Sequence, residues 1–282
     1  MPRKISAQSS IVAEGTKLIK LADHFDFTEG PAVDSHGNVY FTDQPNNQIL
    51  KCSVHGEIEV FLASSGRSNG LYFDAEDNLY ACSDALGQLW KIDSNKNIEV
   101  LLKDFQGKRF NGPNDLWIDP KGGIYFTDPF YQRTYWQHTV PYLSTNNVYY
   151  LSPAGVVSKV ATDLDQPNGI IGTSDGSLLY VSDIDRQVTY SYQIGADGNL
   201  SNQKLFVAMG SDGMTLDELG NVYLTGSGIS IFDTTGKKIE HIKIEEPWTA
   251  NVTFAGPKRD MLFITASRAI YTLKMKVKGA HR

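Results

Sequence analysis

Six oxygen-bearing side chains recur at the same phase of a sequence repeat. Each is an Asn, Asp or Glu, and the six positions are Glu29, Asn69, Asn114, Asn168, Asp212 and Asn251. Carboxylate and amide oxygens are the ligands that hard cations prefer, and Ca²⁺ takes about six to eight of them. Two carboxylates would balance a divalent charge, while the asparagines would add neutral oxygens. If the repeat closes on itself, these marker residues would converge on such a cation.

The spacing of the markers indicates which elements position them. Successive markers are separated by 40, 45, 54, 44 and 39 residues, and a period of about 40 to 50 residues is typical of four-stranded propeller blades. Each marker is followed by an apolar stretch, a turn and a second apolar stretch rich in Val, Ile, Leu, Phe and Tyr, which suits the interior of a stack of sheets. The sequence therefore predicts an all-β fold, a six-bladed β-propeller with four-stranded blades, as a single domain over residues 1–282.

The first repeat unit shows the predicted strands of one blade. They cover residues 30–33, 38–42, 48–53 and 58–63, and the turns between them contain Gly, Asn or Asp.

The last unit lacks a fourth strand. Its strands are predicted at 252–255, 261–265 and 269–275, whereas the stretch KLIKLA at 17–22 resembles the fourth strands of earlier units. We expect this N-terminal strand to complete the last blade, which would remove exposed sheet edges. Residues 1–15 are expected to be a flexible N-terminal segment.

Composition excludes several classes of function. The chain has 282 residues, 26 Lys and Arg against 32 Asp and Glu, and a net charge of −6, so no nucleic-acid partner is expected. No apolar stretch reaches the length of a membrane span. The N-terminus has no apolar core of a signal peptide, which leaves the cytoplasm open, or the periplasm if a signal peptide has been removed. Cys52 and Cys82 are expected to be buried free thiols, and the oligomeric state stays open.

The six markers have a simpler interpretation that must be weighed. Asn and Asp before Gly are ordinary turn residues. However, a turn needs no carboxylate, Glu29 is a poor turn former, and six oxygen side chains share one phase. We therefore interpret the markers as a metal ring. Zinc is less favoured because the six histidines are scattered and show no H-x-H or H-E-x-x-H spacing.

Two further segments could carry chemistry. Residues 172–176 match G-x-S-x-G, but a nucleophile elbow joins a strand to a helix, whereas this match falls in a predicted hairpin turn. The third unit is extended by the aromatic-rich stretch 129–145. Such a loop could be a lid or a pocket wall, or it could pack across a neighbouring blade.

Several short motifs together resemble a known family. They are E-G-P at 29–31, G-K-R-F-N-G-P-N-D-L at 107–116, Q-P-N-G at 166–169 and S-D-G at 211–213. In their order and spacing they resemble the SMP-30/gluconolactonase/luciferin-regenerating enzyme family, in particular its bacterial gluconolactonase-like branch, over about residues 20–275. The resemblance implies a six-bladed propeller that holds a divalent cation on its axis and hydrolyses lactones. Ca²⁺ is the expected ion, with Zn²⁺, Mg²⁺ and Mn²⁺ as alternatives.

The resemblance also assigns roles to residues. It implies metal ligation by Glu29, Asn168 and Asp212, with Asn114 as a further ligand or a substrate contact, and it gives Asp212 the general acid/base role. Apart from the resemblance, we expect Asn69, Asn114 and Asn251 to contact the substrate. Five further residues are expected either to form the pocket wall or to have ordinary surface and packing roles: Arg109, Tyr131, Arg133, Trp136 and His138. Some members of the family carry an Arg two residues before the position of Asn114, where this chain has Gly112, so the resemblance leaves sugar-acid specificity open.

The expected function is a metal-dependent carboxylic ester hydrolase that opens a small-molecule lactone, either a sugar lactone or a related one. The cation would act as a Lewis acid, and Asp212 would pass a proton from the attacking water to the ring oxygen. Two alternatives remain open. One is a phosphotriesterase of the diisopropyl-fluorophosphatase kind on the same ring. The other is a non-catalytic propeller that binds a protein, with Ca²⁺ as a structural plug.

Overall fold

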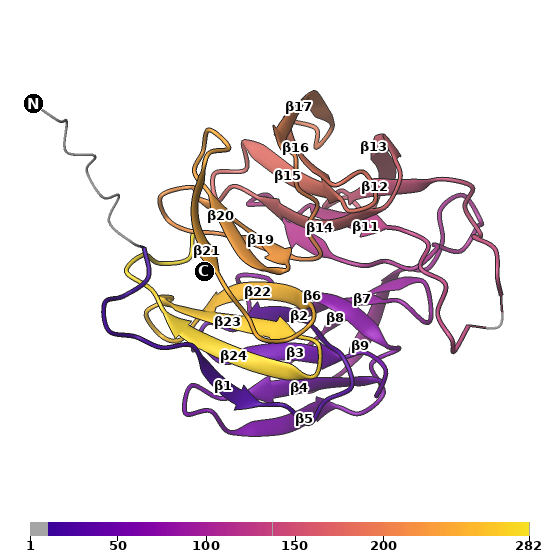
Figure 1. Ribbon diagram of the computed structural model, residues 1–282. Coiled ribbons are helices and arrows are strands. Elements are labelled where there is room, and N and C mark those ends of the chain that lie inside the picture. The colour runs from indigo at the N-terminus through magenta and orange to yellow at the C-terminus, as the bar shows by residue number, and fades with distance from the viewer. Residues whose placement is uncertain (1–10, 137, 282) are drawn as a thin grey trace, which may run out of the picture.

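The six predicted blades are present. The computed structural model describes residues 11–136 and 138–281, and all its regular elements are β-strands. These strands form six four-stranded antiparallel sheets arranged around an axis as a six-bladed β-propeller (Figure 1). None of the described residues belongs to a helix that could cross a membrane.

In blades 1 to 5 the strands follow one another outward from the axis in chain order. Blade 1 contains β2 (Thr28–Val33), β3 (Val39–Asp43), β4 (Gln48–Cys52) and β5 (Ile58–Leu62); blade 2 contains β6 (Ser68–Phe73), β7 (Leu79–Ser83), β8 (Gln88–Ile92) and β9 (Ile98–Leu102); blade 3 contains β10 (Leu116–Ile118), β11 (Ile124–Asp128), β12 (Asn146–Leu151) and β13 (Val157–Leu164). The strands predicted for the first unit are confirmed to within two residues at each end.

The second half of the chain repeats this pattern. Blade 4 contains β14 (Pro167–Gly172), β15 (Leu178–Asp183), β16 (Val188–Ile194) and β17 (Leu200–Val207); blade 5 contains β18 (Met214–Leu216), β19 (Val222–Gly226), β20 (Gly228–Phe232) and β21 (Lys238–Ile242); blade 6 contains β22 (Thr249–Ala255), β23 (Met261–Ala266) and β24 (Ala269–Lys274).

The ring closes as predicted, through an N-terminal strand. β1 (Ile19–Ala22) pairs antiparallel with β24 and becomes the fourth strand of blade 6. Upstream of β1, the amide of Ala13 donates to the carbonyl of Lys274, and Val12 bridges to Met275. Part of the 1–15 segment is therefore bound to blade 6, while residues 1–10 lie outside the described residues.

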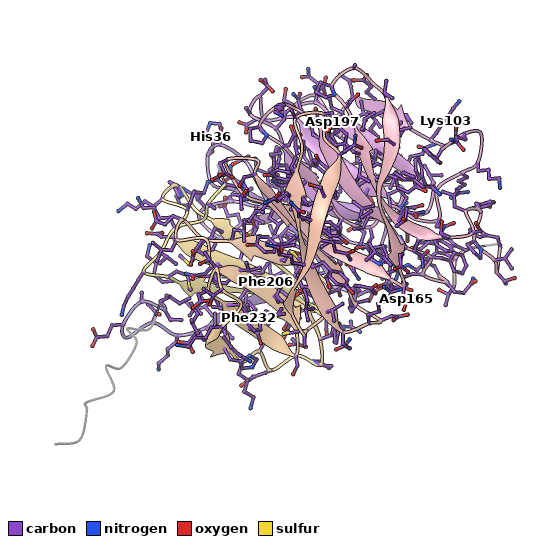
Figure 2. All side chains as sticks on the ribbon, turned by 90° about the horizontal axis from the view of Figure 1, so that it is seen from above. His36, Lys103, Asp165, Asp197, Phe206 and Phe232 are labelled. Carbon is purple, nitrogen blue, oxygen red and sulfur yellow. The ribbon has the colours of Figure 1, made fainter. Side chains whose placement is uncertain are left out.

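Burial follows the distance of each strand from the axis. The inner strands are almost wholly buried, whereas the fourth strands expose side chains such as Val60 and Val100. Aromatic rings pack between neighbouring blades: Phe206 of β17 meets Phe232 of β20 edge-on, with ring centroids 6.4 Å apart (Figure 2). Such contacts stabilise the interface between blades. Cys52 and Cys82 are buried and free, as expected.

The C-terminal segment returns to the axis of the propeller. The amides of Gly279 and Ala280 donate to the carbonyls of Arg259 and Leu216. The ring of His281 then lies beside Tyr72 and Trp117 among the residues that line the narrow axial channel. Burial lowers the pKa of His281 to about 4, and its Nε2 has no hydrogen-bond partner among the described residues.

This buried imidazole predicts a stability that depends on pH. An unfolded chain protonates His281 near its ordinary pKa of 6.5, so between that pH and about 4 the unfolded state binds more protons than the folded one. The contribution of the neutral ring is present above pH 6.5 and is lost as the pH falls, by up to about 1.4 kcal/mol per unit. Urea unfolding at a series of pH values should show this slope.

The matched variant for this test is His281→Phe, which keeps a ring but cannot titrate. The difference in unfolding free energy between wild type and variant isolates the one histidine from the others. A variant whose stability falls with acid as steeply as that of the wild type would contradict the prediction.

Candidate active site

A pocket opens at one end of the propeller axis. Its volume is about 220 Å³, and all six blades or the loops that enter them contribute residues to its lining. The lining residues are Phe27, Glu29, Gln44, Asn69, Asn114, Tyr131, Arg133, Asn168, Ile184, Asp212 and Trp248. Five of the six marker residues therefore come together here, and the loop between β11 and β12 adds Tyr131 and Arg133 to the wall.

The close approach of the inner strands explains why the markers converge. A Cβ atom placed on Gly30 would lie 2.0 Å from the carbonyl oxygen of Asn69, and one on Gly169 would lie 2.6 Å from that of Asp212. Each of these glycines follows a marker and faces the marker of the next blade. Only a residue without a side chain allows the backbones to approach so closely.

Hydroxyl groups from the second strands hold this ring together. The Thr42 hydroxyl donates to the carbonyl of Asn69 at 3.0 Å, and the Thr127 hydroxyl donates to that of Asn168 at 2.8 Å. In both cases the donor belongs to one blade and the acceptor to the next. The Thr of the repeated Thr-Asp motif therefore fixes the marker of the following blade.

Two carboxylates share the floor of the pocket. Glu29 is only 4% exposed and accepts hydrogen bonds from its neighbour Gly30 N (2.7 Å) and from Asn251 Nδ2 (3.2 Å). Asp212 Oδ2 accepts one from Trp248 Nε1 at 2.6 Å. Burial raises the pKa of both groups, and the charge of Asp212 raises the pKa of Glu29 further. Neighbouring buried carboxylates are stable as an ionised pair only if positive charge lies beside them.

Two amide oxygens at the pocket have no hydrogen-bond donor. The Oδ1 atoms of Asn69 and Asn168 are buried and unpartnered among the described residues. The other end of the Asn168 amide is fixed, because its Nδ2 donates to the hydroxyl of Tyr131 at 2.8 Å. A buried oxygen without a donor costs about 1–3 kcal/mol, so these atoms are poised to accept a ligand.

Four residues expected to contact the substrate lie elsewhere. Asn251 bonds to Glu29 from below and lines the axial channel rather than the pocket. Arg109 donates to the carbonyl of Ala85 and lies over a tyrosine ring, so its guanidinium is already engaged. Trp136 and His138 stack on each other with centroids 4.7 Å apart. None of the four is among the residues that line the pocket.

Other pocket residues were not predicted from the sequence. Gln44 and Ile184 follow the second strands of blades 1 and 4, and Trp248 precedes β22. Asp115, next to Asn114, is buried beneath the pocket, and burial raises its pKa to about 7. Only the register of the strands, which the sequence does not show directly, places Gln44 and Ile184 at equivalent positions.

Comparison with known proteins agrees with this geometry. Residues 27–268 match the family model of the SMP-30/Gluconolactonase/LRE-like region. The chain is 27% identical over 300 residues to a gluconolactonase of Zymomonas mobilis, across 96% of this chain and 84% of that protein. It is 24% identical over 242 residues to the diisopropyl-fluorophosphatase of Loligo vulgaris, across 77% of each. A gluconolactonase structure from Xanthomonas campestris superposes with a TM-score of 0.87 at 27% identity, across 94% of this chain and 91% of that one.

The matched region begins just before β2, which carries Glu29, and ends between β23 and β24 of blade 6, so it includes every marker residue. On this match, this chain belongs to the SMP-30/gluconolactonase/LRE-like family.

Proposed function

We propose that this protein is a metal-dependent hydrolase that opens lactones. The observation that carries the proposal is the pair of buried carboxylates beside buried amide oxygens that lack donors. The gluconolactonases of Zymomonas mobilis and Xanthomonas campestris, to which the chain is similar, support a sugar lactone or a related lactone as substrate. The pocket volume of about 220 Å³ lies below the ~300–1,000 Å³ of drug-sized ligand sites, which suits a small ring.

The donor set fits a hard divalent cation. Glu29, Asn168 and Asp212 would hold it, with Asn114 as a further ligand, and Ca²⁺ is the ion that such carboxylate and amide oxygens favour. Within residues 11–136 and 138–281, no three His, Cys, Asp or Glu side chains form a metal-binding group. A site that combines two carboxylates with amides is therefore better suited to Ca²⁺ than to Zn²⁺.

When bound, the cation would supply Lewis-acid polarisation of the lactone carbonyl. The chain supplies the proton transfer. Asp212 would accept a proton from the attacking water as the water oxygen bonds to the carbonyl carbon, and it would return that proton to the ring oxygen as the C–O bond breaks. The product is a hydroxy acid. Trp248 fixes one oxygen of Asp212 at 2.6 Å and so orients the carboxylate.

Chelation tests this function directly. We expect purified protein to contain a divalent metal, and removal of the metal with a chelator to abolish acid release from a panel of lactones in a pH-indicator assay. Re-addition of Ca²⁺ should restore the activity. Lactone hydrolysis that persists at the same rate after complete metal removal, checked by elemental analysis, would contradict the mechanism.

A second arm of the same assay separates the alternatives. Diisopropyl fluorophosphate should release fluoride only if the site acts as a phosphotriesterase, an activity that the similarity to the Loligo enzyme makes worth measuring. A metal-bound protein that hydrolyses neither substrate class would favour the non-catalytic propeller.

A further inference from the structure

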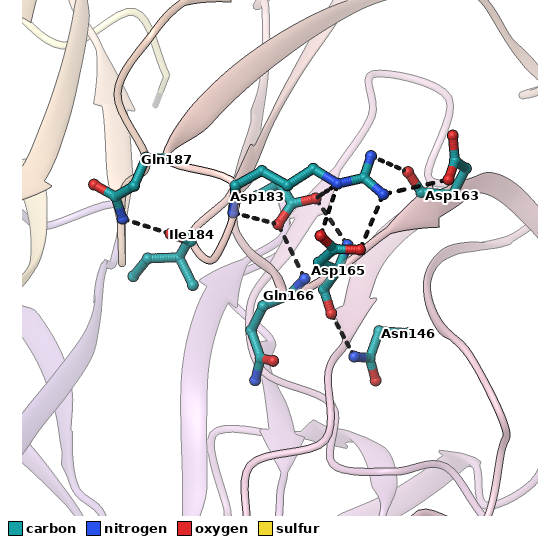
Figure 3. Close-up of polar contacts among 8 residues, drawn as sticks. Asn146, Asp163, Asp165, Gln166, Asp183, Ile184 and Gln187 are labelled. Atoms are coloured by element: carbon teal, nitrogen blue, oxygen red, sulfur yellow. Dashed lines mark hydrogen bonds and ion pairs between the residues drawn. The ribbon is translucent and has the colours of Figure 1, made fainter.

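One carboxylate departs from the pattern shared by other blades. Asp43, Asp128 and Asp183 end the second strands of blades 1, 3 and 4. Each accepts backbone N–H groups from the loop that enters its own blade, such as Gln166 N at 3.0 Å from Asp183. Figure 3 shows this arrangement around Asp183, which also forms an ion pair with Arg186. These three aspartates hold their blades together.

The register of blade 2 shifts its carboxylate by one residue. Asp43 pairs with Gln48 in blade 1, and Ser83 pairs with Gln88 in blade 2. Ser83 therefore occupies the position that Asp43 has in blade 1, and Asp84 occupies the position of Gln44. Gln44 lines the pocket, as does the equivalent Ile184 of blade 4. Asp84 therefore occupies the position that faces the pocket in blades 1 and 4.

Asp84 accepts hydrogen bonds from side chains of two other blades. Its Oδ2 receives Gln44 Nε2 at 3.1 Å, Arg133 Nε at 3.2 Å and the hydroxyl of Tyr135. A Cβ atom on Gly112 would lie 2.5 Å from Oδ1 of Asp84, so the glycine leaves room for the carboxylate. The side chain is 3% exposed, and burial raises its pKa while Arg133 opposes that shift. A buried carboxylate with three donors fixes those donors firmly.

Arg133 presents the rest of its guanidinium to the pocket. Its side chain is 25% exposed and lines the pocket, and its Nε is used by Asp84. Neither of its two Nη groups donates a hydrogen bond to another described residue. Its guanidinium carbon lies 5.1 Å from the ring centroid of Tyr131, whose hydroxyl accepts from Asn168. The free N–H groups are therefore held beside the proposed metal ligands.

We propose that Arg133 is the residue that selects polyhydroxylated lactones, and that Asp84 is the positioning residue that holds it over the pocket. Free guanidinium N–H groups recognise oxygen acceptors. The charge of Arg133 is already balanced by Asp84 at 3.2 Å, so a neutral ring that carries several hydroxyls fits better than an anionic substrate. This inference rests on the proposed lactone hydrolysis and names the residues that would set its specificity.

The test compares two lactones of the same ring size, D-glucono-δ-lactone with ring hydroxyls and δ-valerolactone without them. The Arg133→Gln variant should lower the ratio of kcat/KM for the hydroxylated lactone over the plain one by about 10- to 100-fold, the effect of losing a hydrogen bond to a charged group. The loss should appear chiefly as a higher KM. Asp84→Asn should lower the same ratio by about tenfold, because Arg133 is then misplaced.

Arg186→Gln is the matched control, since Arg186 also pairs with a buried aspartate but does not line the pocket. Its ratio should equal that of the wild type. If Arg133→Gln does not fold, Arg133→Lys keeps the charge and should still lower the ratio, because a lysine cannot reproduce the forked donors. A ratio that neither Arg133 variant changes, or an equal loss on both lactones, would overturn the inference. Wild-type protein inactive on both lactones would instead overturn the proposed function, and the inference with it.

Discussion

Replacing Asp212 with asparagine is expected to lower kcat for lactone opening by about 10²- to 10⁴-fold, the usual contribution of a general acid/base. The substitution keeps the shape of the side chain and an oxygen that can ligate a metal, but it removes the proton acceptor. Among the residues that the structure describes, Asp212 and Glu29 are the two carboxylates that line the pocket. Steady-state kinetics on a lactone, with the metal content of each preparation measured, would report the effect.

Trp248→Phe separates the effect of losing the carboxylate from the effect of losing its orientation. It removes the donor 2.6 Å from Asp212 Oδ2 but leaves the carboxylate in place. We expect a loss of about tenfold, as for one hydrogen bond to a charged group. The base role would be ruled out if Asp212→Asn retained its metal and turned over at a rate close to that of the wild type.

Most of the fold follows from the sequence because each blade repeats the same local rules. The period of the markers and the apolar second strands predict six blades, and the stretch 17–22 predicts the strand that closes them. Residues 19–22 of that stretch form β1, which pairs with β24. These predictions succeed because strand alternation and turn residues are local properties that the ring merely repeats.

The sequence predicted the site residues that belong to the repeat, but not all of those that lie in the loops. Five markers meet at the pocket because they share one phase of the inner strands. The wall residues depend on the loop between β11 and β12, whose path is set by contacts such as that of Tyr135 with Asp84, 51 positions away in the chain. No local pattern encodes such a contact, so the sequence placed Trp136 of this loop in a pocket wall whose lining does not include it.

The glycines after the markers show where a sequence pattern allowed two interpretations. Asn-Gly is a common turn signal, yet Gly70 and Gly169 lie inside the inner strands β6 and β14. Their absent side chains make room for the strand of the next blade, as the distance from Gly169 to Asp212 indicates. The Asn-Gly dipeptide therefore allows neighbouring inner strands to approach each other closely at the axis. This role depends on contacts between blades, which the sequence of one blade does not show.

Gly30→Ala should be strongly destabilising for this reason. A Cβ at this position would lie 2.0 Å from the carbonyl oxygen of Asn69 and 2.7 Å from Cα of Gly70, and both are backbone atoms that cannot turn aside. The residue also has a φ of +42°, which adds a conformational cost of about 1 kcal/mol for alanine. Together with overpacking of about 3 kcal/mol, the free energy of unfolding in urea should fall by about 4 kcal/mol.

Gly56→Ala provides the matched control within the same blade. Gly56 also has a positive φ, +85°, but a Cβ there would meet nothing within 4 Å. It should therefore lose only the conformational contribution of about 1 kcal/mol. The difference between the two variants measures the close approach of blades 1 and 2 at the axis. If both variants lost the same stability, the need for glycine at position 30 would be explained by its backbone conformation alone. The close approach of the inner strands would then not require it.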